Sequence, residues 1–85
     1  MREQHSTAVN RDVGARVHTA MWRSRVTQAQ LGQILGVSQS VVSKRLRGVA
    51  PWSVADLVLV AQALDVEVVE LLPRQTTGTG AAAAQ

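Results

Sequence analysis

Apolar residues recur along this chain at intervals of three and four positions, the spacing that places side chains on one face of an α-helix. Five segments carry this pattern, at residues 10–23, 27–36, 38–47, 54–64 and 66–72. The pattern predicts an all-α domain of five helices over residues 9–73. Residues 1–8 are polar and are expected to form a flexible N-terminal arm. Residues 74–85 contain TTGTG and AAAA and are expected to form a disordered tail or linker.

Helix-capping residues mark two short helices joined by a tight turn. Thr27 and Gln30 have the spacing of a capping box at the start of the first of them. Gly36 can adopt a positive φ angle and end that helix, and Ser38 is a good N-cap for the next one. The sequence therefore predicts a helix, a turn and a second helix between Thr27 and Gly48.

The outer face of the helix after Ser38 is polar and then basic. Its glutamine offers a donor and an acceptor that match adenine, its lysine reaches guanine acceptors, and a valine side chain can touch a thymine methyl. The alternative is a merely solvated polar face. We expect base contacts in the DNA major groove from these residues: Gln39, Ser40, Val41, Ser43 and Lys44.

Charge is distributed unevenly along the chain, whose formal net charge is +3. Between Val13 and Ala55 there are six basic residues and no acidic one, whereas Asp56 to Leu72 holds four acidic residues and no basic one. The first part is suited to attract a polyanion and the second to avoid it. The expected phosphate contacts are Arg23, Arg25, Thr27, Gln28, Ser38, Arg45 and Arg47.

The segment from Thr27 to Gly48 resembles the helix-turn-helix of the phage-repressor and Cro family. The match is carried by Thr27-Gln28, Leu31, Leu35-Gly36-Val37-Ser38, Gln39, Val42-Ser43 and Arg47-Gly48. The resemblance implies a lambda-repressor-like fold, a second helix that enters the major groove, and a Gln28 that touches phosphate and steadies Gln39. Two departures are expected to matter. Gly32 stands where the family usually has alanine. Many members have an apolar residue at the place of Arg45 and a polar one at the place of Leu46, and here the two are exchanged. The guanidinium of Arg45 is therefore expected to be free for a phosphate.

Not every apolar residue fits the predicted core. Trp22 is expected to close the core from the first helix, and Trp52 to act as a structural anchor. On residues 54–64, Leu57, Val58, Ala61 and Leu64 share one face. The surplus outside that face predicts either a dimer seam or ordinary exposed side chains: Val60, Val66, Val69 and Leu72.

The composition excludes several classes of function. The 85 residues include no cysteine, which rules out disulfides and cysteine-zinc sites and fits a reducing cytoplasm. His5 and His18 are far apart in sequence, so no metal or other cofactor is expected, and no paired carboxylates suggest an enzyme. No apolar run is long enough for a membrane helix or signal peptide.

We therefore predict a sequence-specific regulator of transcription that binds double-stranded DNA in the bacterial cytoplasm. Repression is favoured because Gln30 and Gln33 leave the first motif helix without an acidic patch. A module this small grips few base pairs, so a homodimer on an inverted repeat is expected, with half-sites about 34–36 Å apart. The alternative is an antitoxin or another protein-binding module whose last two helices mask a partner protein.

Overall fold

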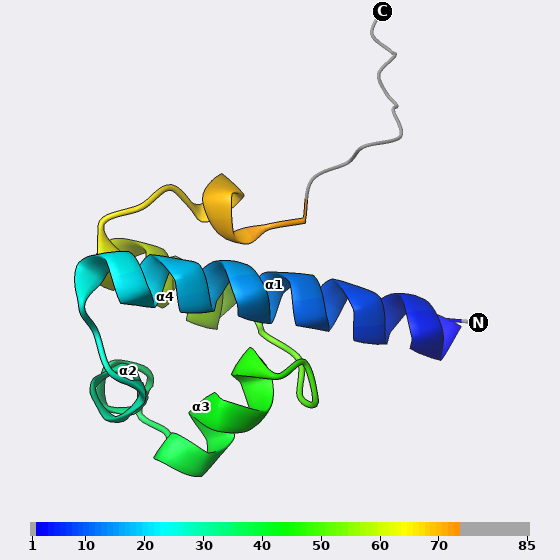
Figure 1. Cartoon of the computed structure of the whole chain (residues 1–85), viewed down its shortest axis with the longest axis horizontal. Helices are drawn as coiled ribbons and strands as arrows, with labels where there is room; N and C mark the ends of the chain where they lie inside the picture. Colours follow the sequence, from blue (N-terminus) through cyan, green and yellow to red (C-terminus); the bar gives the residue numbers. More distant parts are fainter. Residues whose placement is uncertain (1, 74–85) are drawn as a thin grey trace, which may run out of the picture.

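The structure is a computed structural model that describes residues 2–73, with side chains described from residue 7 onward. Its elements are α1 (Arg2–Ser24), α2 (Gln28–Leu35), α3 (Gln39–Leu46), α4 (Val54–Leu64) and the 3-10 helix η1 (Val68–Leu71). In Figure 1, α1 crosses the molecule, with α2 and α3 on one side of it and η1 on the other. Residues 2–73 contain no strand, which confirms the predicted all-α class.

Two helix boundaries differ from the prediction. The fifth helix is a single 3-10 turn, because Asp65 ends α4 in the left-handed region and Pro73 leaves little chain for a longer helix. The first helix begins at Arg2 instead of near Asn10, since no proline or glycine interrupts the chain before Gly14. Residues 2–8, predicted to form a flexible arm, are thus part of α1 in this structure. The tail expected at residues 74–85 lies outside the described residues.

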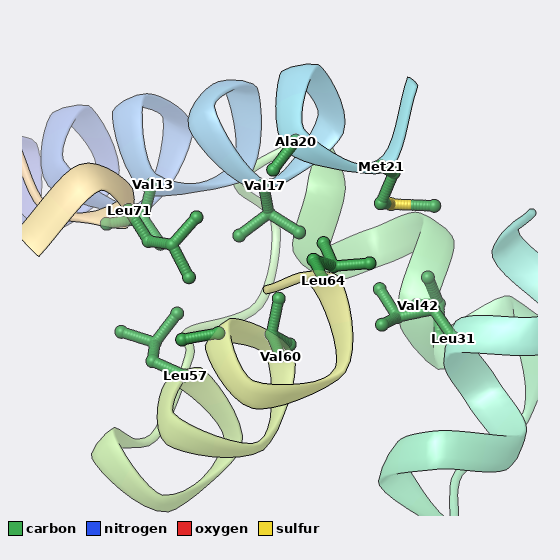
Figure 2. Close-up of a cluster of buried hydrophobic side chains, with 11 residues drawn as sticks. Val13, Val17, Ala20, Met21, Leu31, Val42, Leu57, Val60, Leu64 and Leu71 are labelled. Carbon is green, nitrogen blue, oxygen red and sulfur yellow. The ribbon is translucent and has the colours of Figure 1, made fainter. Parts of the chain in front are cut away.

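The core lies where the underside of α1 meets the other helices. Figure 2 shows the α1 side chains pointing toward those of α4, with the α2 and α3 side chains beside them. The buried apolar residues are Val13, Val17, Ala20, Met21, Leu31, Val42, Leu57, Val60, Ala61, Leu64 and Leu71. Each helix therefore contributes to one shared core, which holds α2 and α3 at a defined angle to α1.

The burial of three apolar residues is the reverse of what the sequence predicted. Trp22 is 79% exposed, and Met21 closes the core in its place. Val60, expected at a dimer seam, is fully buried, whereas Val58 is 37% exposed. The reason is that α4 packs against α1, α2 and η1 together, so the face containing Val60 is covered as well.

Candidate nucleic-acid interface

The turn between α2 and α3 forms as predicted. Gly36 has a φ angle of 71°, and the Val37 N–H donates to the carbonyl of Gly32 at 2.9 Å. Gly32 is buried, and a Cβ at this position would lie 2.8 Å from the carbonyl oxygen of Val37. Only glycine therefore fits here without a shift of the neighbouring backbone, which gives a packing reason for the departure from the family's alanine.

Both helices of the motif are capped by side chains. The Thr27 hydroxyl accepts from the Gln30 N–H at 3.1 Å, and the Gln30 carboxamide oxygen accepts from the Thr27 N–H at 2.9 Å. The Ser38 hydroxyl accepts from the Val41 N–H at 3.2 Å. Side-chain caps occupy some of the free amides at each helix start, and α3 begins at a fixed residue.

The outer face of α3 is presented to solvent. Gln39, Ser40 and Lys44 are exposed, and Val41 and Ser43 are half-buried. No hydrogen bond or ion pair within the described residues occupies the side chains of Gln39, Ser40, Ser43 or Lys44. All five side chains expected to contact bases therefore come from one short helix, and Gln39, Ser40 and Lys44 among them are exposed and unpaired. No hydrogen bond joins Gln28 to Gln39 in this part of the structure.

The end of α3 is anchored differently from the prediction, because the head of Arg45 is not free. Its Nη1 lies 2.6 Å from Oδ2 of Asp56 on α4, and each of these side chains is 19% exposed. Its guanidinium carbon lies 5.9 Å from the centre of the Trp52 ring. The Trp52 indole N–H also donates to the Arg45 carbonyl at 3.1 Å. We call these three residues the Arg45 latch, which ties α3 to α4 and leaves no unpaired charge for a phosphate.

Sequence reasoning missed a second anchor of α3, at Gly14 on α1. A Cβ at Gly14 would overlap the carbonyl oxygen of Leu46 and lie 2.8 Å from that of Arg45. Gly48, with a φ angle of 80°, packs in the same way against Arg11. A glycine inside a helical stripe was the available signal. Two close backbone approaches therefore fix the distance between α1 and the end of α3.

The remaining arginine side chains differ in their exposure and in whether another group pairs with them. Arg16 pairs with Asp12 at 3.0 Å, which removes it from the free positive charge. Arg47 is exposed and its Nε donates to the Ser43 carbonyl at 3.4 Å. Arg23 and Arg25 are exposed and have no ion-pair partner among residues 7–73. Arg25, next to the start of α2, is the better placed of these two, because Arg23 also lines a groove between α1 and η1.

Two other features are absent from the part of the chain that the structure describes, residues 2–73. No group of three or more histidine, cysteine or acidic side chains there could hold a metal ion. None of the helices between Arg2 and Leu71 is long and apolar enough to cross a membrane.

Solved structures share this arrangement of helices. The restriction-modification controller protein C.AhdI from Aeromonas hydrophila is 27% identical, with a TM-score of 0.71 over 78% of this chain and 96% of that one. The clp gene regulator ClgR from Corynebacterium glutamicum is 26% identical, with a TM-score of 0.69 over 73% of this chain and 66% of that one. The DNA-binding domain of BldD is 23% identical, with a TM-score of 0.69 over 80% and 99%. Among curated proteins, no match was found.

The capped helix pair, the exposed face of α3 and these structures define the class of the chain. It is a helix-turn-helix DNA-binding regulator of the phage-repressor and Cro type. Within that class, the chain belongs to the BetR domain family, whose sequence model matches residues 4–83.

Proposed function

We propose that this protein represses transcription by binding, as a homodimer, an operator with two inverted half-sites. α3 enters the major groove, where each base pair presents a distinct pattern of donors and acceptors. One observation carries the proposal. Gln39, Ser40 and Lys44 project from a helix that is fixed at both ends, and they have no partner within the described residues.

Each side chain on α3 has a separate role in this proposal. Gln39 pairs with adenine through its carboxamide, and Lys44 donates to guanine acceptors, each good pair contributing about 1–3 kcal/mol of discrimination. Ser40 and Ser43 make small tolerant contacts, and Val41 packs against a thymine methyl. These contacts supply the sequence preference but a minor part of the affinity.

Phosphate contacts supply most of the affinity and its dependence on salt. Thr27 and Gln28 lie at the start of α2, where free backbone amides favour an anion, and Ser38 occupies the same place on α3. Arg25 and Arg47 add unpaired positive charge on either side of the motif. Arg45 is omitted from this set because Asp56 already neutralises it.

Dimerisation through η1 is supported by exposed apolar side chains. Val69 is 70% exposed and Leu72 is 38% exposed, and Val66 lies beside them as a half-buried residue packed on the core. Val60 is excluded from this seam by its burial. The seam joins two copies so that their α3 helices meet successive major grooves, about 34–36 Å apart.

Repression, not activation, fits the surface of α2. Gln30 and Gln33 are neutral and exposed, so α2 offers no acidic patch to a polymerase subunit. Asp56, in the first turn of α4, is paired with Arg45 and so offers no free carboxylate either. In this proposal the protein has no catalytic role and acts in the cytoplasm on bacterial or phage DNA.

The test is selection of bound sequences from a random duplex pool at physiological salt. We expect a two-fold symmetric motif, and a complex of two proteins per duplex in a mass measurement. Gln39→Ala should then weaken binding to the selected sequence about tenfold or more while leaving random duplexes unaffected. An equal loss on both kinds of duplex, or a pool without enrichment, would contradict sequence reading by α3.

A second candidate function is an antitoxin that masks a partner protein. It is favoured by the exposed apolar side chains of α4, namely Val54, Val58 and Leu59. Co-expression with the product of a neighbouring gene would then give a stable heteromeric complex. That complex would be lost in a Val58→Asp Leu59→Asp variant whose DNA affinity is unchanged.

A further inference from the structure

Trp22 is a large aromatic side chain left in solvent. It is 79% exposed, although an indole is among the largest apolar groups a domain can bury. Trp52 offers a comparison within the same chain, since it packs on the core and its indole N–H donates to the Arg45 carbonyl. The Trp22 N–H has no acceptor within residues 7–73. Trp22 therefore contributes little to the fold and has both an apolar face and a donor available.

The neighbours of Trp22 are cationic. An open hollow beside it is lined also by Arg23, Arg25 and Thr27, and no carboxylate borders it. Arg25 is exposed and has no ion-pair partner among the described residues. Thr27 caps the start of α2, where the helix dipole favours an anion. We call Trp22, Arg25 and Thr27 the Trp22 surface. Its chemistry suits a ligand with negative charge and a flat apolar part.

Helix geometry places the Trp22 surface on the same side of α1 as the helix-turn-helix motif. Trp22 follows Arg11 and His18 at intervals of eleven and four residues, so the three share one face of α1. Arg11 packs against Gly48 just after α3, so this face of α1 is turned toward α3. In Figure 1, the chain runs from the end of α1 directly down to α2. The Trp22 surface is therefore continuous with the start of α2 and lies away from η1.

We propose that the Trp22 surface binds the sugar–phosphate backbone of DNA just outside the half-site, extending the interface beyond the helix-turn-helix. This inference rests on the proposed function. Arg25 would pair with a phosphate, the indole ring would pack on a deoxyribose, and the indole N–H would donate to a phosphate oxygen. A second copy is a poorer occupant, because a symmetric contact centred here would bring two Arg25 side chains together.

The experiment compares two duplexes that carry the same selected sequence. One keeps a full helical turn of flanking DNA on each side and the other is trimmed to the motif. Trp22→Ala should weaken binding to the long duplex about tenfold, which corresponds to about 1.4 kcal/mol, and to the trimmed duplex less than about twofold. Trp22→Phe should fall between, because it keeps an apolar ring and loses the donor. The preference for selected over scrambled sequence should not change, since backbone contacts carry no sequence information.

Val54→Ala is the matched control, because Val54 is 76% exposed and lies on α4. It should bind both duplexes like the wild type, and thermal unfolding should show that all the variants are folded. Equal affinities of Trp22→Ala and wild type on the long duplex would overturn the proposal. So would a loss on both duplexes together with a fall in oligomer mass, which would make this a contact between copies. If the wild-type protein itself bound the selected and scrambled sequences equally well, the proposed function would be rejected instead.

Discussion

Replacing Asp56 by asparagine removes the negative charge of the Arg45 latch and leaves its shape nearly unchanged. The Asp56–Arg45 pair is short, at 2.6 Å, and only a fifth of either side chain is exposed. Breaking a fully buried pair costs about 3–5 kcal/mol and an exposed pair contributes about 0–1 kcal/mol. Asparagine keeps an oxygen that accepts from Arg45, so we expect a loss of about 1–2 kcal/mol.

Urea unfolding measures this loss. For a small domain the slope of free energy against urea is about 1 kcal/mol per molar, so the midpoint should fall by about 1–2 M with the slope unchanged. Asp12→Asn is the matched control, because its pair with Arg16 lies within one helix and is more exposed. That pair should contribute about 0.3–0.5 kcal/mol.

Asp56→Asn should also change DNA binding in a direction opposite to its effect on stability. Without the carboxylate the positive charge of Arg45 is no longer neutralised and can act on one phosphate, so the slope of log affinity against log salt should steepen by about 0.9. Affinity for random duplexes should rise, and the preference for the selected sequence should fall as the end of α3 loosens. An unchanged midpoint together with an unchanged salt slope would refute the latch as described.

Four further variants test other parts of the structure. Gly32→Ala should destabilise the fold by about 1–2 kcal/mol, because the clash with the Val37 carbonyl exceeds the gain in helix propensity; a rise in urea midpoint would contradict the tight crossing. Asp65→Gly should stabilise by about 0.5–1 kcal/mol, since Asp65 has a φ angle of 58°, and thermal unfolding checks the sign. Arg25→Gln should flatten the salt slope by about 0.9, and Arg23→Gln should flatten it less, as titrations of one duplex at several salt concentrations would show.

The features that sequence predicted well are those decided within three or four residues. The caps at Thr27 and Ser38 depend on a hydroxyl and an amide in the same turn, and Gly36 on its own φ angle. Such interactions can be recognised by spacing alone. The exposed face of α3 followed from the same local reasoning, because Val42 is buried and the polar positions lie away from it.

The features that sequence predicted poorly depend on contacts between elements. α4 carries apolar residues on most of its surface, so only the packing of three neighbours shows that Val60 is inside and Val58 is outside. Trp22 and Met21 are adjacent on α1, and only the arrangement of the other helices around α1 shows that Met21 is the one in the core. Arg45 finds Asp56 eleven residues away on another helix, a distance over which spacing carries no signal.

The position of η1 has a practical consequence for measurement. Pro73 follows η1, which Figure 1 places across α1 from α2 and α3. A biotin group joined on this side of the domain would not cover α3, whereas a fluorescent protein there would crowd Val69 and Leu72 of the proposed dimer seam. Immobilised through biotin on this side, the protein should keep its affinity for duplexes, whereas attachment through lysine chemistry would risk modifying Lys44.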